Sequence, residues 1–347
     1  MRALVTGAAG FIGGALAGAL LEAGWHVNLL VRPGSRNKLL DKRKWAGATV
    51  FEADLSRPGS TGDQEHLRRA ASGCDVVFHA AAIRNRWGTT LESYRLTNVE
   101  GTRRLLEAAA GQARRFVYIS SVGVFGYPGV LDIDESFPVI ASTGKAGYHN
   151  SKAEAERLVT ACNEEFESVI VRPTITYGPG DGDGMVTRLI DLIAGGRYVQ
   201  VGPGENHVHL TYIDDLLQGL FLAGTHPAAS GQVFILAGPH SIAVGELVAM
   251  IAGRLGRTVP DLPIPENLAR GAACVVEMVY RTGAALRVKP FQSAPPLTRD
   301  KINTMCIHRG YSSLKAAHML GYQPRVGYAE GIDKTLACRG TFAGEES

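Results

Sequence analysis

A glycine pattern between the first apolar run and the first helical stretch constrains this chain more than any other feature. Residues 2–6 (RALVT) form a strand-like run with an apolar centre, and Thr6-Gly7-Ala8-Ala9-Gly10-Phe11-Ile12-Gly13 begins at its last residue. Gly7 allows a tight turn, Gly10 lets backbone approach a pyrophosphate, and Gly13 lets the helix pack closely. The amides and dipole of a helix N-terminus favour phosphates. The segment therefore predicts a dinucleotide-binding turn, formed by Gly7, Gly10, Phe11, Ile12 and Gly13; a merely tight turn is the alternative.

Apolar strand-like runs alternate with amphipathic helical stretches along the first half of the chain. Such alternation is typical of a parallel sheet with helices on both faces and a site at the carboxyl ends of the strands. After Pro173 glycine and proline clusters break the rhythm. We expect an α/β fold: a Rossmann-type doubly wound sheet over 1–173, and a smaller C-terminal substrate-binding lobe over most of 174–347 that returns one strand near 233–236. Strands are expected at 2–6, 26–31, 49–52, 76–79, 116–120 and 168–171, and helices after Gly10, near 65–72, 99–110, 152–165, 185–194, 214–223 and 244–253.

Composition narrows the possible functions. The 347 residues include 36 lysines and arginines against 33 acids, and this net charge of +3 is spread along the chain, so no nucleic-acid partner is expected. Five cysteines without a CxxC pair argue against a disulfide framework and against a metal site. No uninterrupted apolar run reaches the roughly 18 residues that a membrane span requires. We expect a cytoplasmic protein that acts on a small molecule.

Arg32 stands at the end of the second expected strand, where an acid would bind the ribose of NAD. A guanidinium there would instead meet the 2′-phosphate of NADP. The residue favours NADP over NAD, with a solvated arginine as the alternative.

Two further segments are candidates for cofactor contact. Asp54 and Leu55 follow the third strand, where the carboxylate would bind the adenine amine or cap a helix. His79, which ends the fourth strand, is expected to be structural. The small side chains after it would let the nicotinamide half lie against backbone; these are Ala80, Ala81 and Ala82.

The segment Tyr148-His149-Asn150-Ser151-Lys152 places a tyrosine and a lysine one helical turn apart. Interconversion of a carbonyl and an alcohol needs one group that delivers and takes a proton near neutral pH. A phenol with a pKa of about 10 is a poor base, but a nearby ammonium stabilises the phenolate. The pair predicts that Tyr148 is the acid/base and Lys152 its support; the alternative is two ordinary helix residues.

In register with the glycine turn, with 98–102 (NVEGT) and with Arg172-Pro173, this motif resembles the extended short-chain dehydrogenase/reductase superfamily over residues 1 to about 220. The resemblance implies that Ser121, four residues before Phe125, hydrogen-bonds the substrate oxygen. Ser120 is the weaker candidate because strand alternation turns it the other way. The resemblance also implies that Lys152 binds the nicotinamide ribose, that Asn98 holds a proton-relay water and that Pro173 lies by the carboxamide. The expected catalytic set is Ser121, Tyr148, Lys152 and Asn98, of which the last three also join Pro173 at the cofactor.

The second half of the chain favours one branch of that superfamily. Sugar-nucleotide enzymes usually carry an arginine seven residues before the position of Asp215, and here that residue is Val208. Segments 87–99, 172–181 and 295–299 resemble the 3β-hydroxysteroid dehydrogenase-like branch, which includes sterol-4-carboxylate 3-dehydrogenases and 2-alkyl-3-oxoalkanoate reductases. The resemblance implies a secondary alcohol/ketone oxidoreductase for a bulky apolar substrate, either a sterol, possibly carboxylated at C4, or a long-chain β-keto or β-hydroxy acid. The alternatives are a nucleotide-sugar or hopanoid-associated epimerase or dehydratase with retained NAD, and a non-catalytic NADP sensor.

Residues 268–286 are unusually apolar for a lobe that covers a sheet. Helical spacing favours a core helix, and a lipid-facing gate or a pocket wall is the alternative. Basic residues border this stretch and would favour a carboxylate or a weak association with a membrane surface; they are Arg270, Arg281, Arg287 and Lys289. The superfamily resemblance also implies a homodimer formed by the helix over 99–110 and the helix that carries Tyr148 and Lys152.

Overall fold

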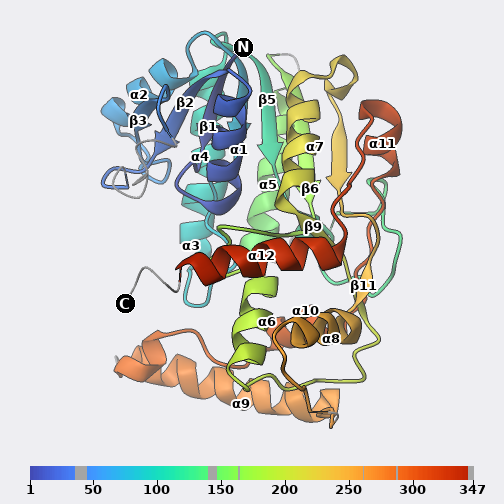
Figure 1. The fold of residues 1–347 in the computed structure, drawn as a ribbon. Coiled ribbons are helices and arrows are strands. Elements are labelled where there is room, and N and C mark those ends of the chain that lie inside the picture. Colours follow the sequence, from blue (N-terminus) through green and yellow to red (C-terminus); the bar gives the residue numbers. More distant parts are fainter. Residues whose placement is uncertain (36–44, 140–146, 163–164, 261, 287, 343–347) are drawn as a thin grey trace.

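The computed structural model describes residues 1–347 except 36–44, 140–146, 163–164, 261, 287 and 343–347 (Figure 1). Its centre is a sheet of seven parallel strands in the order β10-β6-β5-β4-β1-β2-β3. Their carboxyl ends all point toward a mainly helical lobe. The strands are β1 (Arg2–Thr6), β2 (His26–Val31), β3 (Thr49–Glu52), β4 (Cys74–His79), β5 (Ala113–Ile119), β6 (Glu167–Pro173) and β10 (Val233–Leu236).

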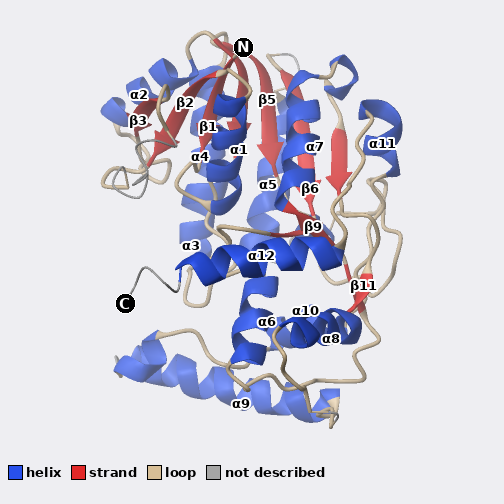
Figure 2. Cartoon of the chain, in the orientation of Figure 1, coloured by secondary structure: helices blue, strands red, loops and turns tan. Residues whose placement is uncertain are grey.

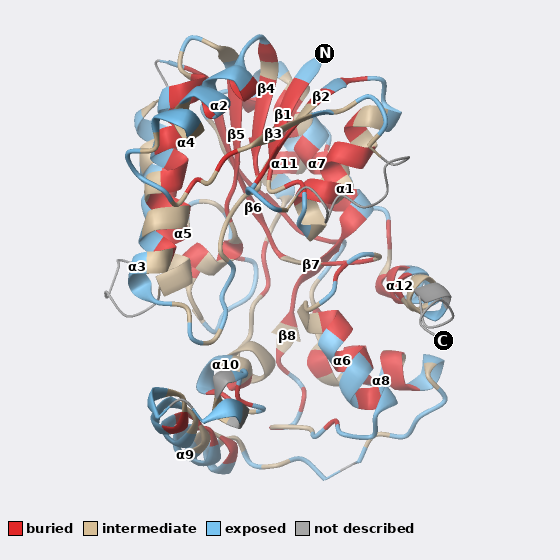
Figure 3. Ribbon diagram, turned by 90° about the vertical axis from the view of Figure 1, so that its left-hand side faces the viewer, coloured by how far each residue is buried: buried red, intermediate tan, exposed pale blue. Residues whose placement is uncertain are grey.

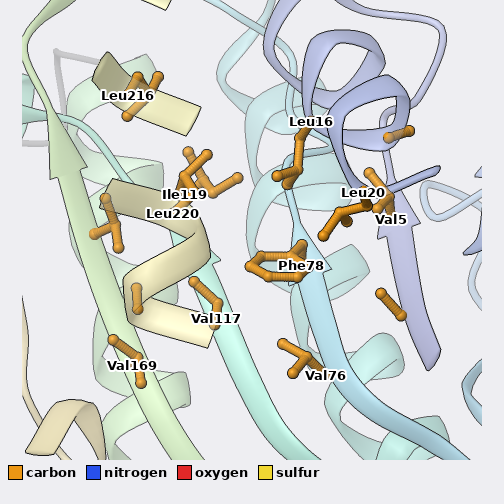
Figure 4. Packing of buried hydrophobic residues seen from close by; sticks show 14 of the residues in the cluster. Val5, Leu16, Leu20, Val76, Phe78, Val117, Ile119, Val169, Leu216 and Leu220 are labelled. Carbon is orange, nitrogen blue, oxygen red and sulfur yellow. The ribbon is translucent and has the colours of Figure 1, made fainter. Parts of the chain in front are cut away.

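Helices cover both faces of the sheet because alternate strand residues point to opposite sides. On one face, Val5 and Phe78 pack with Leu16 and Leu220 from two of the helices (Figure 4). This layer consists of α1 (Phe11–Glu22), α7 (Ile213–Thr225) and α11 (Leu314–Leu320). The other layer consists of α2 (Thr61–Ala71), α4 (Gly101–Ala109) and α5 (Gly147–Ala161), and α5 packs beside α4.

The strand order reverses at β1, which pairs with β2 on one side and with β4 on the other. In open α/β sheets the chain segments after the strands separate at such a point and leave room for a ligand. Short elements after β4 and β5 border this edge. They are α3 (Leu91–Tyr94), the π-helix η2 (Arg95–Glu100) and the 3₁₀ turn η3 (Val122–Phe125).

The lobe beyond the carboxyl ends contains two small two-stranded sheets and several helices (Figure 2). One sheet pairs β7 (Ile175–Tyr177) with β9 (Leu210–Tyr212), and the other pairs β8 (His207–Val208) with β11 (Ile242–Ala243). The helices are α6 (Met185–Ala194), α8 (Val244–Arg254), α9 (Glu266–Ala285), α10 (Arg299–Cys306) and α12 (Tyr328–Phe342), with 3₁₀ turns η4 (Pro227–Ala229) and η5 (Lys289–Gln292).

The predicted Rossmann-type sheet, its helical layers and the return strand β10 are confirmed. Sequence reasoning did not assign the two small sheets, the π-helix η2 or helices α10, α11 and α12. From the second half of the chain, the sequence predicted only the strand near 233–236 as part of the sheet domain. In the structure, α7 and α11 from that half also pack on the sheet. The division at residue 173 stays a prediction.

The prediction that the apolar stretch 268–286 forms a core helix is wrong, as the positions of the α9 side chains show. The buried positions of α9 are small or polar, among them Ala269, Ala273 and Glu277. Its large apolar side chains face away from the molecule, and the helix is largely exposed in Figure 3. The exposed residues are Leu268, Val275, Met278, Val279 and Leu286. Arg287 lies outside the described residues. Within the described parts of the chain, no helix is long and apolar enough to cross a membrane.

We predict that Gly13→Ala destabilises the protein by about 1–3 kcal/mol, the usual cost of overpacking. A Cβ atom there would overlap the carbonyl oxygen of Gly7 and lie 2.7 Å from its carbon, so α1 would have to move off β1. Urea unfolding measures the change. Gly271→Ala in α9 is the matched control, since no atom lies within 4 Å of its Cβ position, and it should stabilise by about 0.5–1 kcal/mol. Equal effects of the two substitutions would contradict the packing argument.

Candidate active site

The glycine turn lies where the strand order reverses. Gly7 follows β1 with a φ of 69°, which glycine adopts without strain. The Gly10 amide donates to the Gly7 carbonyl at 2.8 Å, and α1 begins at the next residue. The first amides of a helix have no partner within it, and no acidic side chain occupies the first turn of α1. The turn therefore presents amide donors and a positive dipole end that fit a pyrophosphate.

The turn packs against the segment after β4. A Cβ atom on Gly7 would lie 2.9 Å from the Cα atom of Ala81, so only glycine permits this approach. The Ala81 amide also donates to the Thr6 hydroxyl at 3.0 Å, which holds the two segments together. The other residues predicted to contact the cofactor lie on the same edge of the sheet; they are Ala80 and Ala82 after β4, Phe11 and Ile12 at the start of α1, and Pro173 at the end of β6.

Arg32 and Asp54 stand near each other at the ends of β2 and β3. The Arg32 side chain is exposed and has no hydrogen-bond or ion-pair partner among the described residues. The Asp54 carboxylate accepts from the Ser56 amide and hydroxyl at 2.9 and 2.7 Å. Burial raises the pKa of Asp54, but these hydrogen bonds and the charges of Arg57 and Arg32 hold it below its usual value. Asp54 thus caps its own turn, and Leu55 beside it is buried.

Ser121, Tyr148 and Lys152 come together from the end of β5 and the first turns of α5. The Ser121 hydroxyl accepts from the Gly123 amide at 3.1 Å and lies close enough to the Tyr148 phenol to act on its pKa. Burial raises the pKa of Tyr148, although the Ser121 hydroxyl and the charge of Arg84 partly offset this rise. Ser120 is buried and its hydroxyl has no partner among the described residues, so it takes no part in this contact.

Lys152 follows Tyr148 by one helical turn and is buried. Its ammonium donates to the Ile119 carbonyl at 2.6 Å and lies 4.1 Å from the centre of the Tyr118 ring. Burial lowers the pKa of Lys152 to about 7, against the opposing charge of Glu156. The Glu156 carboxylate itself accepts from two guanidinium nitrogens of Arg172, Nε and Nη2, at 3.0 and 2.7 Å. It therefore only partly offsets the effect of burial on the pKa of Lys152.

Asn98 lies in the π-helix η2 and is almost fully buried. Its side-chain amide makes two hydrogen bonds with the backbone of Ile83. The side-chain oxygen accepts from the Ile83 amide at 2.8 Å, and the side-chain nitrogen donates to the Ile83 carbonyl at 3.1 Å. The same nitrogen donates to the Ser151 hydroxyl at 2.9 Å, which in turn donates to the Tyr148 carbonyl at 2.7 Å. Asn98 therefore links the segment after β4 to the helix that carries Tyr148.

His79 is the centre of a buried network that sequence reasoning did not detect. The Thr102 hydroxyl donates to the Asn98 carbonyl at 2.6 Å, so it must accept from His79 Nε2 at 3.0 Å. His79 Nδ1 must then accept from the Thr6 hydroxyl at 2.8 Å, which itself accepts from the Ala81 amide. Burial lowers the pKa of His79 to about 3, which fits this neutral tautomer. Thr6 and His79 each stand at the end of a predicted strand, and this is the sequence signal that could have revealed the contact. In the structure the two residues pair across β1 and β4.

Two adjoining cavities open beside the predicted catalytic residues. The larger, of ≈ 1290 Å³, is lined by Tyr148 and by residues from α6, α9 and α10. The smaller, of ≈ 230 Å³, is lined by Ser121. Both are bordered by Asn85, His149 and Asp300, so they meet next to the tyrosine and the serine.

Many of the residues that line the larger cavity come from distant parts of the sequence and were not predicted. Seven of the residues that line this cavity are arginine or lysine. Examples are Arg84 after β4, Arg188 on α6 and Lys301 on α10. No local pattern connects such positions, because only the placement of the lobe over the sheet brings them together.

Residues 3–237 match the NAD dependent epimerase/dehydratase family. The chain belongs to this family. It is thus an enzyme of the extended short-chain dehydrogenase/reductase type, as the sequence motifs predicted. The family is described as NAD dependent, and the preference for NADP stays a prediction.

Curated relatives carry the names of the predicted branch. The 4-hydroxy-2-methyl-3-oxo-4-farnesyl-3,4-dihydroquinoline-1-oxide ketoreductase of Stigmatella aurantiaca is 31% identical, over 96% of this chain and 95% of the relative. The 2-alkyl-3-oxoalkanoate reductase of Stenotrophomonas maltophilia is 30% identical, over 97% and 99%. The decarboxylating sterol-4-alpha-carboxylate 3-dehydrogenase of Candida albicans is 28% identical, over 82% and 81%.

Solved structures share the fold over nearly the whole chain. The crystal structure of gox2253 has a TM-score of 0.76 and 30% identity, with 98% of each chain covered. The UDP-glucuronic acid 4-epimerase of Bacillus cereus, in complex with UDP-glucuronic acid and NAD, has a TM-score of 0.74 and 23% identity, with 99% of this chain and 100% of the epimerase covered. At that identity the second likeness concerns the fold alone.

We predict that Lys152 makes the free energy of unfolding rise with pH between about 7 and 10 in protein without added cofactor. The unfolded lysine titrates near pH 10.4, whereas the folded pKa is about 7, so the unfolded chain binds more protons in this window. Denaturant unfolding at several pH values, with the Lys152→Met curve subtracted, measures the effect. Lys289→Met removes an exposed lysine and is the control. A flat difference between the wild-type and Lys152→Met curves would show that the folded pKa is ordinary.

Proposed function

We propose that this enzyme interconverts a secondary alcohol and a ketone, with a preference for NADP, on a substrate that has a long or bulky apolar part. The substrate is a sterol or a long-chain β-oxygenated acid. The observation that carries the proposal is the meeting of Ser121, Tyr148 and Lys152 beside a cavity on the sheet edge that also bears the glycine turn. Named relatives that reduce 3-oxo compounds support the chemistry.

The protonation state of Tyr148 suits reduction of a ketone. Because burial raises its pKa, the side chain is a phenol at neutral pH and has a proton to give to the substrate oxygen. The phenolate left behind is stabilised by the Ser121 hydroxyl and by the positive charge of Arg84. When bound, the nicotinamide exchanges a hydride with the carbon that carries this oxygen.

Val208 supports this reading over a nucleotide-sugar enzyme. The residue is fully buried in β8, where it pairs with Ile242 of β11. An apolar side chain cannot make the bidentate contact to a diphosphate that an arginine would supply at this position.

We predict that Tyr148→Phe lowers kcat by roughly 10²–10⁴-fold, the usual contribution of a positioned acid/base, and leaves cofactor affinity nearly unchanged. The assay follows NADPH at 340 nm with 3-ketosteroids and with 2-alkyl-3-oxoalkanoates, and fluorescence titration measures NADPH binding. Tyr177→Phe is the matched control, since that buried hydroxyl has no partner among the described residues and lines neither cavity. Conversion of UDP-sugars with no turnover of either ketone would refute the proposal, as would full activity of Tyr148→Phe.

We also predict that Arg32→Ala weakens NADPH binding by about 10- to 100-fold, the worth of a charged hydrogen bond, with little change for NADH. Arg57→Ala provides the comparison, because Arg57 is also exposed and also lies near Asp54. If both substitutions weaken NADPH equally, the effect comes from the general field at this edge. Equal affinity of the wild-type protein for NADH and NADPH would contradict the proposed preference for NADP.

A further inference from the structure

The larger cavity carries an excess of positive charge. Among its described lining residues, seven are arginine or lysine and three are aspartate or glutamate. The acids are already engaged: Asp183 by Arg84 and Arg86, Glu277 by Arg299, and Asp300 by Tyr127 and Asn85. Arg270 is paired with Glu266 next to the cavity, and the remaining excess is not neutralised among the described residues of the cavity wall.

The excess is concentrated around Asp183. Both Arg84 and Arg86 donate to this one carboxylate, Arg86 at 3.1 Å. Burial raises the pKa of Asp183, but Arg84, Arg86 and Arg188 together hold it below its usual value. Three guanidinium groups thus surround Asp183, and the charge of Arg84 also acts on the neighbouring Asp181.

Arg188 and Lys301 extend this cluster along the cavity. The Arg188 side chain has no hydrogen-bond or ion-pair partner among the described residues, although its charge acts on Asp183. Among the described residues, the Lys301 ammonium donates to the carbonyls of Pro295 and Pro296, at 2.6 and 3.1 Å, and to no carboxylate. Burial and the charge of Arg188 lower the pKa of Lys301, so the two cations stand close enough to repel each other. An anion bound between them would relieve this repulsion.

The cluster reaches the predicted proton donor through Arg84. The charge of Arg84 acts on the Tyr148 phenol, while its guanidinium binds Asp183. In a β-keto acid one carbon separates the ketone from the carboxylate. A ketone oxygen held by Tyr148 would therefore leave its carboxylate at the edge of the cluster.

We propose that Arg84, Arg188 and Lys301 form an anion subsite that binds a carboxylate next to the reacting carbonyl. This inference rests on the proposed function and narrows its substrate to β-oxygenated acids. The subsite would recognise the carboxylate by its negative charge and by paired hydrogen bonds from an arginine. The methyl ester of the same acid has no charge and cannot form this paired contact.

The experiment measures binding separately from turnover. Tyr148→Phe protein saturated with NADP is titrated with 3-hydroxydecanoate and with its methyl ester, and the wild type is assayed for oxidation of both. We expect the acid to bind at least tenfold more tightly than the ester. Arg188→Gln should reduce acid affinity about tenfold or more and change ester affinity less than twofold. Arg281→Gln, which removes a cation of the same cavity that lies near Glu277, should change both little.

Two binding outcomes overturn the inference: equal affinity for acid and ester, or equal losses for both ligands in Arg188→Gln. A third outcome would also overturn the inference: UDP displaces the acid, and Arg188→Gln weakens UDP binding but leaves acid affinity unchanged. The subsite would then bind a diphosphate. Absence of turnover with any acid, ester or ketosteroid by the wild type refutes the proposed function instead. The binding titration would still decide whether the subsite exists.

Discussion

The hydrogen bond from the Ala81 amide to the Thr6 hydroxyl joins the glycine turn to the rest of the site. Through Thr6 it begins a buried run of hydrogen bonds that passes His79 and Thr102 to the Asn98 carbonyl. The Asn98 side chain continues the run through Ser151 to the Tyr148 carbonyl. Each hydrogen bond in the run has one assigned direction, so loss of a link leaves a buried polar group unsatisfied at a cost of about 1–3 kcal/mol. The position of the proposed acid/base is thereby tied to the position of the cofactor turn.

Lys152 shows that the same region is not arranged for stability alone. A buried ammonium loses its hydration, and here a backbone carbonyl, an aromatic face and the already paired Glu156 replace it. These partners leave the pKa of Lys152 at about 7, far below that of a lysine in water. An apolar residue of similar size would fit the interior at lower cost. The retained charge fits the predicted contact with a nicotinamide ribose, whereas its contacts among the described residues are Ile119 and Tyr118 and not the Tyr148 phenol.

Local sequence patterns predicted the sheet and the motif residues because both depend on neighbours in the chain. Strand β10 was found from four apolar residues, and Tyr148 and Lys152 from helical spacing. The π-helix at Asn98 was not predicted, because its hydrogen-bond register depends on the contacts of Asn98 with Ile83 and Ser151.

Other features depend on how the two halves of the chain meet. The apolar residues of α9 have the spacing of a core helix, yet they are exposed because the opposite side of that helix, with Glu277, closes the cavity. The cluster of Arg84, Arg188 and Lys301 unites positions more than a hundred residues apart. Charge counted along the sequence could not reveal it, since the chain as a whole is nearly neutral.

The two cavities, taken with the proposed chemistry, restrict how a substrate would lie. A ketone oxygen that bonds to both Ser121 and Tyr148 must sit where the cavities meet, so the two substituents of the carbonyl carbon point into different spaces. On this proposal the carboxylate points into the ≈ 1290 Å³ cavity, because Arg84, Arg188 and Lys301 line that cavity and not the ≈ 230 Å³ one. Trp87 and Leu91 add apolar surface to the wall of the larger cavity. Such an arrangement suits a molecule that is charged near its carbonyl and apolar at its far end.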